Sequence, residues 1–103
     1  MRATVATILI LASVSAANAL DPAAQRGLTF VQTNCAMCHA IGRFGTSRLP
    51  LAPPFRTLHE RYPGENLEEA LAEGIVTGHP NMPPIQLDPG QIADVIAYMK
   101  TLE

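Results

Sequence analysis

The chain has 103 residues, of which 48% are hydrophobic and 5% aromatic, and its seven basic and nine acidic residues give a net charge of −2. This length is typical of one domain. An acidic excess excludes the basic surface that a nucleic-acid-binding protein needs, so no nucleic-acid partner is expected.

Residues 1–19 have the pattern of a secretory signal peptide. Arg2 provides a positive start, residues 5–14 are mostly apolar, and Ala17-Asn18-Ala19 supplies the small residues of a cleavage site. The apolar stretch is much shorter than the roughly 20 residues that span a membrane, which disfavours an uncleaved anchor. We therefore predict export to the periplasm, cleavage before Leu20, and a mature protein that is not embedded in the membrane.

The predicted mature domain, residues 20–103, has 84 residues and a net charge of −3, because six basic residues remain against nine acidic ones. A hydrophobic core is marginal in so short a chain without a cofactor, a metal or disulfides. Export would place both cysteines in an oxidising compartment, where free thiols tend to pair. Cys35 and Cys38 therefore need an assigned role.

The mature domain begins with a helix predicted over about residues 22–33. Asp21 is a suitable N-cap, and Pro22 suits the first helical position. Residues 35–39 are expected to continue as a short helical turn. Residues 42–54 then contain two glycines and three prolines, and an irregular loop of this length in a small domain usually serves a function or wraps around something.

Two further helices are predicted in the second half of the chain. One spans about residues 66–73 and ends at Gly74. The last starts after Asp88, where Gln91 completes a capping box, and its apolar residues recur at helical spacing: Ile92, Val95, Ile96, Met99 and Leu102. Because no strand pattern is present, the expected fold is all-α, with three or four helices joined by long proline-rich loops.

The motif CAMCH, residues 35–39, contains the only two cysteines of the chain. A thioredoxin-like redox pair would need a βαβ setting, which is absent from the predicted elements. A structural zinc site needs four ligands. Cys35, Cys38, His59 and His79 offer four, but at a spacing that matches no compact zinc finger, and His39 would then have no purpose.

Covalent haem attachment uses every residue of the motif, since C-x-x-C-H is the signature of c-type haem binding. Residues three apart on a helical turn lie on one side, about 5–6 Å apart. The sulfurs of Cys35 and Cys38 can then bond to the two vinyl groups on one porphyrin edge, while His39 binds the iron. We predict one covalently attached haem c per chain.

A sixth iron ligand is expected from a downstream methionine. Met37 lies inside the attachment motif, and Met99 has the spacing of a core residue on the last helix. Met82 lies between prolines in an irregular stretch that suits an extended backbone beside a flat ring. Met82 is therefore the favoured ligand, and His79 is its rival.

With these motifs in place, the mature chain resembles the class I c-type cytochromes over nearly all of residues 20–103. The glycine and apolar residue that the family has four apart in its first helix are matched by Gly27 and Val31, next to Phe30. Tyr98 matches the aromatic of the family's last helix. The resemblance implies a cytochrome c-like fold, with N- and C-terminal helices crossing beside one covalent haem.

The resemblance also implies roles for two loop residues. Family members have a Gly-Pro-x-Leu segment whose proline carbonyl accepts a hydrogen bond from the axial histidine. Pro53 is the counterpart here, although Ala52 replaces the glycine. The family's methionine-proline pair in the sixth-ligand loop is matched by Met82-Pro83.

The predicted function is electron transfer. Histidine and methionine ligation raises the reduction potential, and an iron with six ligands has no open site, so we expect a carrier and not an enzyme. Its partners would be redox proteins such as a periplasmic dehydrogenase or oxidase, and the chain would be a monomer or a subunit of a redox complex. A gas-binding haem protein is the competing class. Four arginines would either pair with the haem propionates or form plain surface charge. They are Arg43, Arg48, Arg56 and Arg61.

Overall fold

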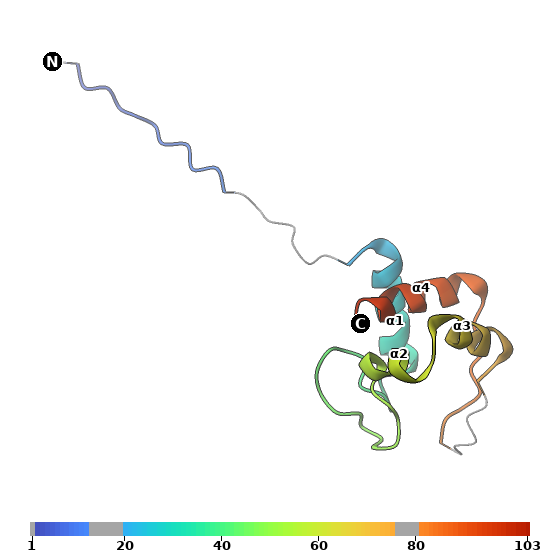
Figure 1. The fold of residues 1–103 in the computed structure, drawn as a ribbon. Coiled ribbons are helices and arrows are strands. Elements are labelled where there is room, and N and C mark those ends of the chain that lie inside the picture. Colours follow the sequence, from blue (N-terminus) through green and yellow to red (C-terminus); the bar gives the residue numbers. More distant parts are fainter. Residues whose placement is uncertain (1, 13–19, 76–80) are drawn as a thin grey trace.

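A computed structural model describes residues 2–12, 20–75 and 81–103. Residues 2–12 are exposed and have no regular secondary structure. The remaining described residues form five helical elements (Figure 1): α1 (Pro22–Asn34), the 3₁₀ helix η1 (Phe55–Thr57), α2 (Leu58–Arg61), α3 (Gly64–Glu73) and α4 (Pro89–Lys100). None of these residues lies in a strand, and the predicted all-α fold is confirmed.

The two long helices begin as the sequence predicts. The Asp21 side chain accepts a hydrogen bond of 2.8 Å from the Ala24 amide, which caps α1. At α4, the Asp88 side chain accepts from the Gln91 amide, and the Gln91 side chain accepts from the Asp88 amide, so the capping box is complete. Both helices thus satisfy backbone donors that would otherwise lack partners.

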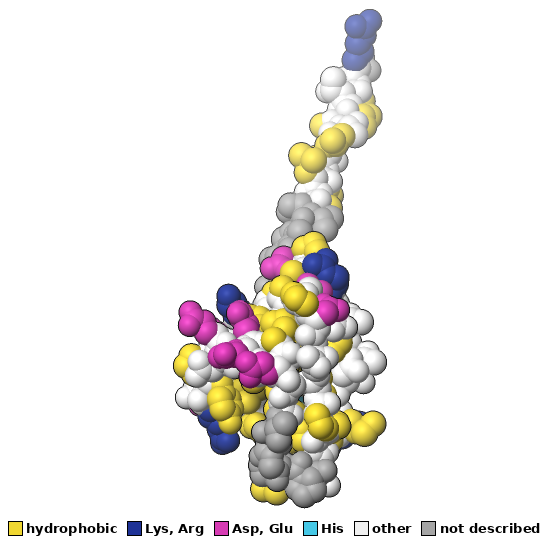
Figure 2. All heavy atoms as spheres, turned by 90° about the vertical axis from the view of Figure 1, so that its right-hand side faces the viewer, with side chains coloured by type: hydrophobic (Ala, Val, Ile, Leu, Met, Phe, Trp, Pro, Cys, Tyr) yellow, Lys and Arg dark blue, Asp and Glu magenta, His cyan; other side chains and the backbone are white. Residues whose placement is uncertain are grey.

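The boundaries of α3 are partly as predicted. The helix ends at Glu73, and Gly74 follows with a φ of 96°, a left-handed conformation that glycine adopts without strain. It begins at Gly64, two residues before the predicted start, and no side chain caps its first turn. Figure 2 looks onto the side of the molecule that carries α3, where acidic side chains gather. The exposed glutamates of α3 are Glu65, Glu68, Glu69 and Glu73.

The crossing of α1 with α4 is the main helix packing and confirms the expected contact of the terminal helices. Gly27 is buried so close to α4 that an added Cβ would lie 2.0 Å from the Asp94 carbonyl oxygen. On the outside of the crossing, the Arg26 guanidinium binds the Asp94 carboxylate through two contacts of 3.0 Å. The core around the crossing is built from Val31, Phe55, Leu58, Leu71, Leu87, Val95, Ile96, Tyr98 and Met99.

Two irregular segments lie at one end of the molecule. Residues 41–54 contain no helix, as predicted, and residues 81–88 contain none either. Figure 1 shows both segments at the lower end of the molecule, where α1 finishes. Among the helices of the described residues, the longest has 13 residues, and none combines the length and hydrophobicity that a membrane crossing requires.

Candidate functional site

The CAMCH motif forms a turn directly after α1. The Cys35 amide still donates to the Val31 carbonyl at 2.9 Å, as in the helix, and the Cys38 and His39 amides both donate to the Cys35 carbonyl, at 3.2 and 3.0 Å. The predicted helical turn is therefore confirmed. It holds the two cysteines three residues apart on one turn at the end of a rigid helix.

Both thiols of this turn are half-buried, and neither takes part in a disulfide. Burial raises the pKa of the Cys35 thiol to about 11. The thiol group of Cys35 therefore stays protonated near neutral pH. Redox-active cysteines have lowered pKa values because the thiolate is the nucleophile, so Cys35 lacks the usual property of a disulfide-exchange site.

The imidazole of His39 is oriented by the backbone of the following loop. Its Nδ1 atom lies 2.7 Å from the Pro53 carbonyl oxygen. A carbonyl only accepts hydrogen bonds, so Nδ1 carries a proton, and in the neutral imidazole Nε2 then keeps its lone pair. The Phe55 ring packs beside the imidazole, with 5.1 Å between ring centroids. Buried Ala52 precedes Pro53 without disturbing this contact.

Residues 40–55 fold back through three further hydrogen bonds, one to the motif and two to Ala40, the residue directly after it. The Leu49 amide donates to the Cys38 carbonyl at 3.1 Å, and the Phe55 amide donates to the Ala40 carbonyl at 2.9 Å. The Ala40 amide donates to the Ser47 hydroxyl oxygen at 3.0 Å. The sequence gives no signal for the role of Ser47, because a serine in an irregular loop has no characteristic spacing from its partner.

Met82 comes from the separate segment 81–88 and is half-buried. That segment is tied to the end of α3, because the Ile75 amide donates to the Ile85 carbonyl at 3.2 Å and the Leu87 amide donates to the Leu71 carbonyl at 2.9 Å. His79, the rival ligand, lies outside the described residues. The structure thus brings His39 and Pro53 into contact, whereas Met82 is supplied by a second loop.

Two of the four candidate arginines donate to main-chain carbonyls. Arg43 donates to Thr101 at 2.7 Å, and Arg56 donates to Gly45 at 2.8 Å. Arg43 therefore joins the loop of residues 41–54 to the end of α4, and Arg56 joins η1 to the same loop. His59 is exposed on α2.

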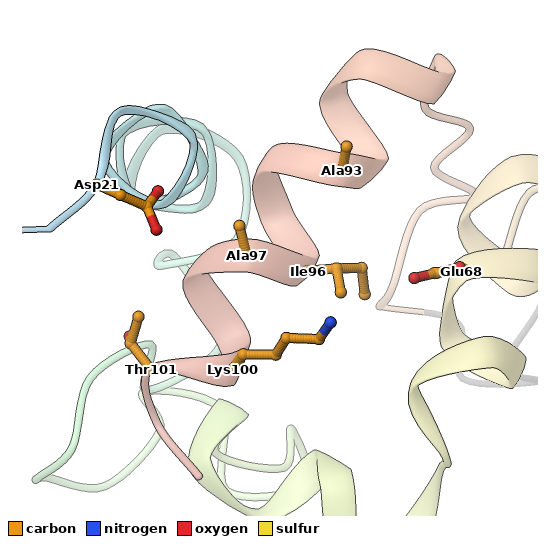
Figure 3. Close-up of a pocket in the computed structure, with 7 residues that line it drawn as sticks. All are labelled: Asp21, Glu68, Ala93, Ile96, Ala97, Lys100 and Thr101. Carbon is orange, nitrogen blue, oxygen red and sulfur yellow. The ribbon is translucent and has the colours of Figure 1, made fainter.

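An open surface groove of about 500 Å³ lies elsewhere, over the outer face of α4 between the start of α1 and α3 (Figure 3). Its floor is apolar and its rim carries charges of both signs. No member of the CAMCH motif, nor Pro53 or Met82, contributes to it, so the groove is separate from the predicted site. The lining residues are Asp21, Glu68, Ala93, Ile96, Ala97, Lys100 and Thr101.

Two comparisons with known proteins find similarity to this chain. The family model of cytochrome c matches residues 24–103. The chain is also similar to a cytochrome c-553-like protein of Synechocystis sp., with 32% identity over 90 residues, which cover 86% of this chain and 78% of the relative. No solved structure matches the chain.

Proposed function

Because the chain belongs to the cytochrome c family, whose members transfer electrons through a covalently attached haem c, we propose that it is a one-electron carrier with His39 and Met82 as iron ligands. The bound haem supplies the redox couple. The residues of this chain attach the group, orient its ligands and limit access of other molecules to the iron.

Cys35 and Cys38 are proposed to attach the haem. Each thiol would add across one vinyl group, its sulfur bonding to one carbon and its proton passing to the other, so that no oxidant is required. Their spacing on one turn supports this assignment, because it puts both sulfurs on one side of the chain. The raised pKa of Cys35 fits a buried thiol that ends as a neutral thioether.

The hydrogen bond between His39 and Pro53 is the observation that most supports the proposal. It fixes the tautomer in which Nε2 is free, and it fixes the ring plane. A metal-binding histidine commonly donates its other ring proton to a carbonyl or carboxylate, which raises the basicity of the ligand. Pro53 is therefore proposed to act on the iron through His39.

Met82 is proposed as the second axial ligand. A thioether is a soft donor that favours ferrous iron and raises the potential. With both axial positions filled by the protein, the chain would have no site for a substrate and would act as a carrier for periplasmic redox proteins such as a dehydrogenase or an oxidase. It would work as a monomer or as a subunit of a redox complex.

The carrier function predicts that the haem-loaded protein gives a reversible one-electron wave in voltammetry and does not bind carbon monoxide when reduced. The physical reason is that Met82 already occupies the position that the gas would take. Absorption spectra of the reduced protein with and without carbon monoxide check this. A carbon monoxide complex of the untreated wild type would instead support a gas-binding protein.

Export and attachment together predict the mass of the secreted protein. After denaturation, the intact mass should equal residues 20–103 plus one haem, because thioether bonds survive unfolding and the signal peptide would be removed. Mass spectrometry of periplasmic protein checks both parts. A mass without haem would contradict attachment at Cys35 and Cys38, and retention of residues 1–19 would contradict cleavage.

A further inference from the structure

The peptide segment that follows His39, residues 41–43, is held by two hydrogen bonds to residues at the end of the chain. The Tyr98 hydroxyl of α4 donates to the Ile41 carbonyl at 2.6 Å. The Arg43 guanidinium donates to the Thr101 carbonyl at 2.7 Å, beyond the last turn of α4. Both contacts therefore fasten residues 41–43 to the C-terminal end of α4.

The same segment is also fixed from within its own loop. The Ala40 amide and carbonyl bind Ser47 and Phe55, and the His39 ring binds Pro53. These three bonds close the loop, and Phe55 also belongs to the core around the helix crossing. Among the described hydrogen bonds of residues 41–43, those with Tyr98 and Thr101 tie the peptide after His39 directly to α4 and the residue that follows it.

The hydroxyl of Tyr98 has no role in the helix crossing itself. The Tyr98 side chain is buried, and its Cβ atom packs against Gly27 of α1. A phenylalanine ring would fill nearly the same space. Burial raises the pKa of the phenol, although Arg43 acts in the opposite direction, so the hydroxyl is protonated and donates near neutral pH. Its one described partner is the Ile41 carbonyl.

We propose that Tyr98 is a positioning residue for His39: its hydroxyl holds Ile41 against α4 and so keeps the His39 ring in its hydrogen bond with Pro53. The inference rests on the proposed role of His39 as an iron ligand. A ligand that keeps its orientation when the iron changes charge needs less rearrangement for each electron transferred. The C-terminal helix would then contribute to the ligand geometry as well as to the core.

The test compares Tyr98→Phe with Arg26→Gln in the reduced, haem-loaded protein. Tyr98→Phe removes one hydroxyl and keeps the ring. Arg26→Gln breaks the Arg26–Asp94 ion pair on the same helix crossing but touches nothing in residues 39–43. The measurement is hydrogen exchange of the His39 Nδ1 proton by NMR, with the slowest amide protons of α1 as the reference for global opening.

We expect the His39 Nδ1 proton to exchange roughly two- to tenfold faster in Tyr98→Phe, the range for loss of one hydrogen bond, and to accelerate more than the α1 amides. In Arg26→Gln it should change no more than those amides. Equal acceleration of the ring proton and the α1 amides in Tyr98→Phe would overturn the proposal, because the hydroxyl would then contribute only to global stability.

A second variant keeps the proposal testable if Tyr98→Phe does not fold. Arg43→Gln removes the other contact to α4 and should accelerate the same ring proton by a smaller factor, because Arg43 is exposed. If the His39 ring proton exchanges at the wild-type rate in Arg43→Gln, then holding residues 41–43 against α4 does not position His39, and the proposal is overturned. Failure of the proposed function is seen separately, since a His39 that does not bind iron would lack haem-shifted ring signals in the wild type.

Discussion

Replacing Gly27 by alanine should destabilise the haem-loaded protein by at least about 3 kcal/mol, the upper part of the usual range for overpacking. The new Cβ would lie 2.0 Å from the Asp94 carbonyl oxygen and 2.6 Å from its carbon. Both are backbone atoms of α4, which cannot rotate away as a side chain could. The clash can be relieved only if α1 and α4 move apart, and that separation would loosen the core along the crossing.

Thermal unfolding of the haem-loaded variant measures this effect. A loss of 3 kcal/mol corresponds to a fall in Tm of roughly 12–24 °C for a domain of this size. Gly64→Ala is the matched control, because Gly64 also lies in a helix but has no atom near the position of an added Cβ. We expect its Tm to stay the same or rise slightly, as alanine restricts the unfolded chain. Similar Tm values for the two variants would show that the close crossing is absent in solution.

The helices that the sequence predicts well are those whose ends are encoded by neighbouring residues. Asp21 with Pro22 and Asp88 with Gln91 act within one turn, so the starts of α1 and α4 follow from the local sequence. The crossing is different. A glycine inside a helix is locally unfavourable. At position 27 it is needed because the carbonyl of residue 94 lies where a Cβ atom would be. Only the family resemblance predicts that contact.

The short helices η1 and α2 are absent from the sequence prediction for a physical reason. They have three and four residues, and neither has a side chain that caps its start. Helices this short contain too few residues to show a helical spacing of apolar side chains. They are stabilised mainly by burial of Phe55 and Leu58 in the core. Such elements follow from tertiary packing rather than from local preference.

In the candidate site, too, local contacts could be predicted from the sequence and contacts between distant residues could not. The turn of residues 35–39 could be predicted because its hydrogen bonds are local, and the pairing of His39 with Pro53 follows from the resemblance. The bond from Tyr98 to Ile41 links residues 57 positions apart through a backbone carbonyl, and every residue type has such a carbonyl. No sequence pattern marks that partner. His79 lies outside the described residues, and substitution of Met82 and of His79 in turn distinguishes the two candidate ligands.

Met82→Ala should change the redox behaviour of the haem-loaded protein strongly. If the Met82 sulfur binds the iron, the oxidised wild type shows the weak far-red absorption band of thioether-bound ferric haem, and the variant loses it. The reduction potential should fall, because a harder oxygen donor such as water stabilises ferric iron better than sulfur does. The reduced variant should also bind carbon monoxide, since the position is no longer blocked by the protein. Absorption spectra and voltammetry measure all three.

His79→Ala is the matched control for Met82→Ala. The two residues lie three apart in the same stretch of the chain, and each substitution removes one candidate ligand. The far-red band and the potential should stay nearly unchanged in His79→Ala. The reverse result, a large effect of His79→Ala and none of Met82→Ala, would indicate two histidine ligands. The potential would then be lower, because imidazole favours ferrous iron less than a thioether does, and the protein would suit partners of lower potential. If neither substitution has an effect and the wild type already binds carbon monoxide, the iron has an open position, and gas binding replaces electron transfer as the function.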